Sequence, residues 1–465
     1  MGGRYARRRL DRFSRRPVDR LEWKRPHTGR QSPRANPPAR FRTPRDRSRG
    51  RRSQGVHEAM DGDAETTNRS RYGTRGRDLP GKREIVSAHE MRSSVTEEML
   101  CQLHCRSLVA GLCVLTSALL AAQTTAPRLP PAPPNPPVAS VQAPLDPGYA
   151  ALIARCKTPP PARGGRGPGG GARGGQPQGV KDYAVTEIPG VIKAGGKWTF
   201  VWQQAGNNGD GIVGADDGGL LVAQNDSSRV VKLETNGKPS VAYSDTHTGG
   251  ALSMSAKGDL FIVERGLHMK VEQLAPRRRL LTDSFQGEPL DCAGGVINDL
   301  TADSRGGVYF TMGGLFYADP KGVVTRYGEN LTTNGIILSP DEKTLYVTNG
   351  ATLAAFDVQK DGSLTNQREF VKFTAAGGDG ATIDSQGRLY VTTAAGVEVI
   401  GHDGKHLGVI PTPRAVISCA FGGTDKKTLF LLARGAQDAE GNEVANAAQV
   451  WSIPMIAQGY KGRAK

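Results

Sequence analysis

A short phrase recurs six times in the C-terminal two-thirds of this 465-residue chain: Gly-x or Lys-Thr, followed by three or four apolar residues. Aligned on the first apolar residue, successive copies are 40, 48, 37, 44 and 40 residues apart. Repeats of about 40 residues with short β-rich runs are typical of β-propeller blades. Because a propeller arranges its blades around one axis, equivalent residues of the repeat are expected to meet there. The aligned residues are Leu220, Leu260, Val308, Leu345, Leu389 and Leu429.

Residues 181–465 have the pattern of an all-β domain. From about Tyr183, β-branched and aromatic residues alternate between closely spaced turns of Gly, Asp and Asn, as in a series of short antiparallel strands. This length divides into six units of about 46 residues, enough for four strands in each unit. We predict a six-bladed β-propeller. Its ring would close by pairing of residues 449–453 with a strand near residues 198–201.

The first 90 residues differ in composition from the rest of the chain. They hold 25 of the 61 basic residues and 11 of the 45 acidic ones. They are rich in Arg, Pro, Gly and Ser and poor in apolar residues, so we predict a disordered segment without a core. A nucleic-acid-binding arm is one interpretation. We favour the other, in which this stretch is translated from a start codon assigned too far upstream, and we predict no nucleic-acid partner.

Residues 91–122 resemble a secretory signal peptide. A short segment with Arg106 precedes an apolar run that starts near Leu108, and small residues end it at Ala121-Ala122. The run is short for a membrane span, and no basic cluster follows it. We therefore expect a periplasmic or secreted protein. The alternative is an uncleaved anchor, and in both cases the membrane would be contacted only through this segment.

Residues 123–180 are rich in Pro and Gly, and we interpret them as a spacer before the propeller. Beyond the signal segment the chain has three cysteines, Cys156, Cys292 and Cys419. Their number and spacing do not indicate a disulfide framework or a metal-binding motif. A propeller that closes through its own sheet contacts does not need a disulfide framework.

One position of the repeat carries an oxygen-bearing side chain in most copies. It lies 10 residues before the aligned apolar residue, or 11 in the Lys-Thr copies. Asx-Gly is a common turn element that needs no function, but turn chemistry alone does not demand Asp or Asn at one fixed offset in four copies. The six positions are Asp210, Gly250, Asn298, Asn334, Asp379 and Ser418.

Two carboxylates and two amide oxygens on one axis form a site suited to a hard divalent cation such as Ca²⁺ or Mg²⁺. Without a cation, two neighbouring carboxylates repel each other, and one pKa rises. A cation at the mouth of a channel can polarise a carbonyl oxygen, and a carboxylate beside it can deprotonate water. We predict a divalent cofactor, with Ca²⁺ first and Mg²⁺, Mn²⁺ and Zn²⁺ as alternatives.

These phrases resemble the senescence marker protein/gluconolactonase family, which consists of calcium-dependent lactone hydrolases with a six-bladed propeller. The resemblance covers about residues 185–455. It is most specific in the order of several phrases, each preceding a copy of the repeat. They are Asn298-Asp299-Leu300-Thr301, Asn334-Gly335-Ile336-Ile337, Asp379-Gly380-Ala381-Thr382 and Ala420-Phe421-Gly422-Gly423.

The resemblance implies a role for each matching residue. Asn334 and Asp379 match metal ligands, and Asp379 also matches the general base. Asn298 matches an Asn near the metal and the substrate. Asp210 matches a ligand that is usually Glu, which is one methylene longer.

Two further positions depart from the family pattern. An Arg found two residues before the substrate Asn in sugar-lactone enzymes is Val296 here, and the second-blade position, often Asn, is Gly250. A sugar lactone is therefore not an assured substrate.

Other residues near the predicted channel mouth complete the candidates. His247 is assigned to substrate binding, although a loop His is more often merely solvated. The pair Glu264-Arg265 either reaches the mouth or is exposed. Ser418 lacks the G-x-S-x-G turn of a serine hydrolase.

We predict an exported, cation-dependent hydrolase that takes a small-molecule lactone or ester and acts as a monomer. The alternative is a non-catalytic propeller that binds a ligand or a partner and holds a structural cation.

Overall fold

The computed structural model describes residues 139–160, 180–204 and 208–465. The basic segment predicted at 1–90 and the signal segment at 91–122 lie outside these residues. Within the described part, no helix is long and apolar enough to cross a membrane.

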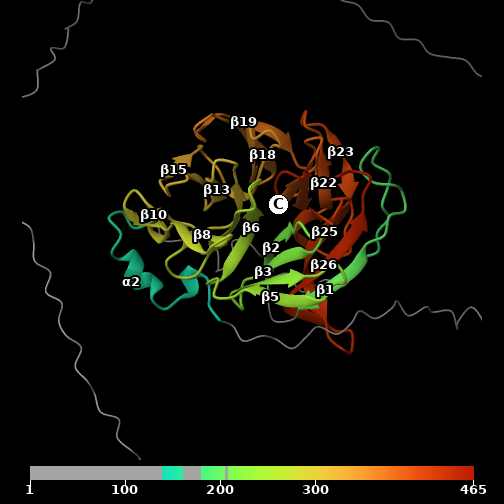
Figure 1. Ribbon diagram of the computed structural model, residues 1–465, viewed down its shortest axis with the longest axis horizontal. Coiled ribbons are helices and arrows are strands. Elements are labelled where there is room, and N and C mark those ends of the chain that lie inside the picture. The colour runs from blue at the N-terminus through green and yellow to red at the C-terminus, as the bar shows by residue number, and fades with distance from the viewer. Residues whose placement is uncertain (1–138, 161–179, 205–207) are drawn as a thin grey trace, which may run out of the picture. The chain divides into compact units, whose positions relative to one another are not determined.

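The described residues form a six-bladed β-propeller, as the repeat predicts (Figure 1). Each blade is a four-stranded antiparallel sheet, and the first strand of each sheet contacts the first strands of the two neighbouring sheets around the axis. Blade 1 contains β2 (Gly209–Gly214), β3 (Leu220–Gln224), β4 (Arg229–Leu233) and β5 (Pro239–Tyr243); blade 2 contains β6 (Gly249–Met254), β7 (Leu260–Glu264), β8 (Lys270–Ala275) and β9 (Arg279–Thr282). Blade 3 contains β12 (Leu300–Ala302), β13 (Val308–Thr311), β14 (Leu315–Ala318) and β15 (Val324–Tyr327).

The other three blades follow the same order from the axis outward, except that the last one takes its outer strand from the start of the domain. Blade 4 contains β16 (Thr333–Leu338), β17 (Thr344–Asn349), β18 (Thr352–Val358) and β19 (Leu364–Lys372); blade 5 contains β20 (Ala381–Ile383), β21 (Leu389–Thr393), β22 (Gly396–Ile400) and β23 (His406–Ile410). Blade 6 contains β24 (Val416–Gly422), β25 (Thr428–Gln437), β26 (Glu443–Pro454) and β1 (Thr199–Gln204).

The pairing of β1 with β26 closes the ring. Thr199 lies opposite Ser452 and Phe200 opposite Trp451, and these two aromatic rings pack edge to face. The predicted closure between residues 449–453 and 198–201 is therefore confirmed.

The recurring phrase is the turn and second strand of each blade. In all six copies a backbone N–H closes a turn onto the carbonyl three residues earlier, as in Gly258 to Ser255 and Glu342 to Ser339. The donor residue has a positive φ in each turn, +83° at Gly258 and +55° at Glu342. Glycine adopts this conformation without a steric penalty, which explains its recurrence at this point.

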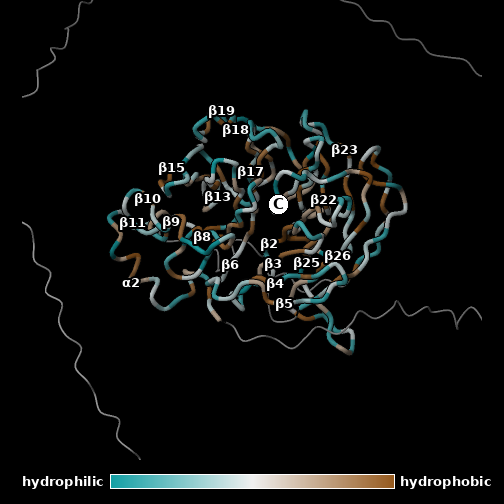
Figure 2. The backbone as a smooth tube through the Cα atoms, in the orientation of Figure 1, coloured by the Kyte–Doolittle hydropathy of each residue, from teal (hydrophilic) through white to brown (hydrophobic). Residues whose placement is uncertain are grey.

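Apolar residues are buried between neighbouring blades. In β7, Phe261 and Val263 pack in a cluster with blade 3, and Leu260 and Ile262 pack in a cluster with blade 1. Successive side chains of a strand point to opposite faces, so a blade between two others needs apolar residues at consecutive positions. Figure 2 shows such hydrophobic stretches along the strands of the sheets.

Residues 139–160, which we call the strap, pack against blades 2 and 3. The strap contains the 3-10 helix η1 (Ala143–Leu145) and the helix α2 (Tyr149–Ile153), and it contacts η2 (Leu290–Ala293), which follows the small hairpin of β10 (Ser284–Phe285) and β11 (Glu288–Pro289). The backbone N–H of Ala143 donates to the carbonyl of Arg265 at 2.7 Å. This part of the predicted spacer is therefore folded onto the propeller.

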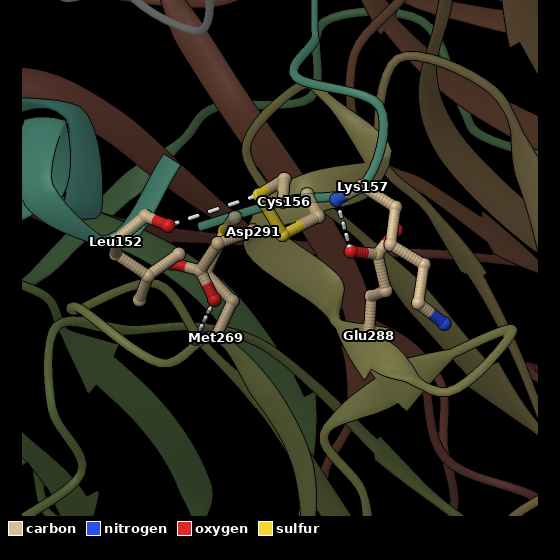
Figure 3. Close-up of a disulfide and its surroundings, with 7 residues drawn as sticks. Leu152, Cys156, Lys157, Met269, Glu288 and Asp291 are labelled. Atoms are coloured by element: carbon tan, nitrogen blue, oxygen red, sulfur yellow. Dashed lines mark hydrogen bonds between the residues drawn. A yellow bond between two sulfur atoms is a disulfide. The ribbon is translucent and has the colours of Figure 1, made fainter. Parts of the chain in front are cut away.

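A disulfide between Cys156 and Cys292 fastens the strap (Figure 3). Beside it, the N–H of Lys157 donates to Glu288 at 2.5 Å, and Asp291 accepts from the N–H of Met269 at 3.0 Å. The number and spacing of the cysteines did not indicate this disulfide, and the ring of blades closes through β1 and β26 without it. The two cysteines are 136 residues apart, so only the docking of the strap on blade 3 brings them together.

Replacing both Cys156 and Cys292 by Ser is expected to lower the free energy of unfolding by about 2–4 kcal/mol, because the cross-link restricts the unfolded chain. Urea denaturation under non-reducing conditions measures the difference. A reducing agent should destabilise the wild type and leave the double variant unchanged. Equal stability of the two proteins without reductant would contradict the prediction.

Candidate active site

Five of the six equivalent repeat positions line a single cavity at the axis. They are Asp210, Asn298, Asn334, Asp379 and Ser418. Each lies among the first three residues of the first strand of its blade or two residues before that strand, so the fixed offset in the repeat becomes a shared end of the channel. The cavity leaves about 10 Å³ for the centre of a water-sized sphere, which is room for one water or one ion.

Two of these residues are hydrogen-bonded to each other. The Nδ2 of Asn298 donates to the Oδ1 of Asn334 at 2.5 Å, which orients both amides across the boundary between blades 3 and 4. Both side chains are half-buried and border the cavity.

The side chains at the equivalent positions form a ring around the axis. In blade 2 the equivalent residue is Gly250, which has no side chain, and Arg265 occupies its place in this ring. A Cβ on Gly250 would collide with the guanidinium of Arg265, so glycine at this position makes room for the arginine. The guanidinium forms an ion pair with Asp210 and donates to the Oδ1 of Asn298 at 2.7 Å. It also donates to the carbonyls of Ile297, at 2.9 Å, and of Asn298, at 2.6 Å.

The arginine is therefore part of the ring. It is only 4% exposed, and it links blade 1 to blade 3. The sequence left open whether Glu264 and Arg265 reach the channel mouth or are exposed. Arg265 reaches the mouth. Its neighbour Glu264 is buried in a different ionic cluster, where it pairs with Lys270 and Arg278.

Asp299 and Lys465 are site residues that the sequence did not identify. Both line the cavity, and the Nζ of Lys465 lies 2.6 Å from the Oδ2 of Asp299. The same carboxylate oxygen accepts a hydrogen bond from the N–H of Ile336 at 2.8 Å. Asp299 follows Asn298 directly and shares its phrase, but its partner Lys465 is 166 residues away.

Asp379 is the carboxylate of this group that has no ion-pair partner among the described residues. Asp210 pairs with Arg265 and Asp299 pairs with Lys465, whereas the charges of Arg434 and Arg265 only partly offset the rise in the pKa of Asp379. Burial, reinforced by the negative charge of Asp210, raises the pKa of Asp379 to about 8. The carboxyl is half-buried and borders the cavity.

The ring fits a single hard cation. Asp379 and Asn334 border a space of ionic size, and burial of Asp379 beside Asp210 raises its pKa, a cost to the ionised form that a cation would offset. Asp210 would be shared with Arg265. Among the described residues no three His, Cys, Asp or Glu side chains gather as a metal site. A cation here would have carboxylate and amide oxygens as its ligands.

His247 and Val296 lie outside this cavity. His247 is exposed and lines a separate cavity with Ser140 and Asp146 of the strap. Its carbonyl accepts from the N–H of Arg265 at 3.1 Å, so its backbone supports the ring while its side chain faces elsewhere. Val296 packs against the apolar cluster between blades 2 and 3.

Comparison with known proteins agrees with this architecture. Residues 241–434 match the SMP-30/Gluconolactonase/LRE-like region. A gluconolactonase of Zymomonas mobilis is 27% identical over 217 residues, which are 39% of this chain and 60% of that protein. The lactonase drp35 of Staphylococcus saprophyticus is 34% identical over 192 residues, which are 36% of this chain and 57% of that protein.

The match thus spans less than two thirds of the length of either relative. The solved structure of a gluconolactonase from Xanthomonas campestris superposes with a TM-score of 0.50 at 22% identity and covers 60% of this chain and 96% of that one. That similarity shows the propeller fold. The ordered phrases at Asn298, Asn334 and Asp379 all lie within the segment that resembles this family region.

Proposed function

We propose that this protein is an exported hydrolase of lactones or related esters that depends on a divalent cation. One observation carries the proposal: the unpaired carboxylate of Asp379 and the amides of Asn298 and Asn334 border one small cavity at the channel axis. The family and the two lactonase relatives support the reaction class. The substrate class is a small molecule with a cyclic or open ester.

Asp379 acts as the general base. Its carboxylate takes a proton from a water molecule while the water oxygen attacks the ester carbonyl carbon. When the tetrahedral intermediate collapses, the bond to the ring oxygen breaks and Asp379 returns the proton to that oxygen. The product is a hydroxy acid, and the carboxylate is restored.

Asn298 and Asn334 hold the reacting groups in place. Their mutual hydrogen bond uses the Oδ1 of Asn334 as acceptor and holds both amides at the cavity, and the second lone pair of that oxygen is available to a cation. A divalent cation held by Asp379, Asn334 and Asp210 would supply positive charge that favours ionised Asp379 and polarises the carbonyl oxygen. Since the cavity has room for only one small particle, we expect the body of the lactone to lie outside it, toward the mouth.

Export has separate support. Disulfides form and persist in oxidising compartments, and Cys156 and Cys292 are joined. This agrees with the signal segment predicted at residues 91–122 and with a periplasmic or secreted protein.

A panel of aldonolactones and aliphatic lactones, assayed by acid release with Ca²⁺, Mg²⁺, Mn²⁺ and Zn²⁺ in turn, tests the function. We expect turnover with at least one lactone, loss of turnover on chelation, and recovery when the cation is restored. A protein that loses thermal stability on chelation but turns over no lactone or ester would instead be a binding propeller with a structural cation.

A further inference from the structure

The residues after the last strand enter the channel from the end opposite to the ring. We call residues 455–465 the plug. Its backbone pairs with the far ends of the first strands: Tyr460 donates to Ile383 at 3.2 Å, and Ala464 and Met254 exchange two hydrogen bonds. In Figure 1 the mark at the end of the chain lies near the middle of the ring of sheets.

The plug ends beneath the ring. The Nη2 of Arg463 donates to the carbonyl of Leu338 at 2.6 Å, and Thr382 donates to the carbonyl of Lys465. The side chain of Lys465 then reaches the cavity, where it is 4% exposed. Its ammonium contacts Asp299 and the carbonyl of Ile336, so it joins blade 3 to blade 4.

A buried ammonium is retained only with good partners, because removing its charge from water is costly. Burial lowers the pKa of Lys465, and the carboxylate of Asp299 opposes that effect. The carboxylate of Asp299 is therefore already occupied by its ion pair with Lys465. Among the residues that the structure describes, Asp379 is the cavity carboxylate without an ion-pair partner.

The position of Lys465 also affects the two amides. Asp299 follows Asn298 in the chain, and Ile336 lies two residues after Asn334. By binding Asp299 and the carbonyl of Ile336, the ammonium fixes the spacing of the two strand starts that carry the hydrogen-bonded amides.

We propose that Lys465 is a positioning residue of this site and that the plug forms its floor. Lys465 keeps Asp299 from acting as a further cation ligand and holds Asn298 and Asn334 at the cavity. The turnover part of this inference rests on the proposed lactonase function, whereas the cation part does not.

The test uses Lys465→Met and Lys465→Gln, with Lys465→Arg as the conservative variant and Lys461→Met as the control. Lys461 is an exposed lysine of the same plug. Calcium affinity is measured by titration calorimetry at constant pH, and kcat at saturating Ca²⁺ with a lactone from the panel. Gln keeps a hydrogen-bonding group if the Met variant does not fold.

We expect loss of the ammonium to raise calcium affinity at least about tenfold, because Asp299 becomes available to the cation. In the same variants kcat should fall at least about tenfold, and Lys465→Arg should restore both values toward the wild type. Lys461→Met should match the wild type. A merely structural plug would lower affinity and kcat together.

Unchanged affinity and kcat in Lys465→Gln, or a joint loss of both, would overturn the proposal. A wild-type protein that binds no divalent cation would also overturn it. A wild type that binds Ca²⁺ but turns over no lactone would contradict only the proposed function, since the affinity measurements judge Lys465 separately.

Discussion

Asp379→Asn is expected to reduce kcat at saturating cation by at least about 100-fold, because the amide cannot accept the proton from water. The substitution keeps the size of the side chain, so the propeller should stay folded. Steady-state lactone hydrolysis measures the effect. Asp403→Asn, in an exposed turn of the same blade, is the control and should retain wild-type turnover. Full activity in a folded Asp379→Asn protein would remove this residue from the mechanism.

The same variant should change how stability depends on pH. The pKa of Asp379 is about 8 in the folded protein, against 3.8 as its ordinary value, so between these values the folded state binds more protons than the unfolded state. In chelator, stability contributed by the protonated form is therefore present below about pH 4 and is lost as the pH rises through about 8, on the order of a few kcal/mol. Thermal unfolding at pH 5 and pH 8 should show this slope in the wild type and a flatter one in Asp379→Asn.

Arg265→Met is expected to lower the free energy of unfolding by about 3–5 kcal/mol, because it leaves Asp210 without its cationic partner. It also removes the donors to the carbonyls of Ile297 and Asn298. Urea denaturation in chelator at fixed pH measures the loss. The matched control is Arg368→Met, since the pair of Arg368 with Asp357 is on the surface and such pairs contribute only about 0–1 kcal/mol.

Gly250→Ala tests the same contact by displacing the side chain of Arg265 instead of removing it. The added methyl group would collide with the guanidinium, so the arginine must leave its place while its charge remains in the protein. We expect a loss of stability in the same direction as in Arg265→Met. Wild-type stability of both variants would show that the guanidinium does not hold the ring together.

The sequence predicted those features that the repeat encodes. Asp210, Asn298, Asn334 and Asp379 share one offset from a hairpin that every blade repeats, so their meeting at the axis follows from the fold. The side chains that complete the ring come from outside the repeat. Arg265 enters only because Gly250 leaves space, and Lys465 arrives on a segment that follows the last strand.

The same reason explains why the pairing of the two cysteines was not predicted. Cys156 precedes the first strand and Cys292 lies in a connection between blades. The two cysteines do not occupy equivalent positions of the repeat, so the repeat could not predict that they are in contact. His247 was assigned to the mouth from its place in a loop, but the direction of a loop side chain depends on its local backbone, which has a positive φ of 40° at this residue.

The closing sheet also has a consequence for biosynthesis. Blade 6 combines the first strand of the domain, β1, with three strands that end at Pro454. During synthesis from the N-terminus, β1 emerges with an unpaired edge. About 240 further residues must be synthesised before its partner strand β26 is available. Contacts of such long range form late, so a nascent chain remains without its final sheet until nearly all of it has left the ribosome. A protein that must pass a membrane pore unfolded would have this delay built into its topology.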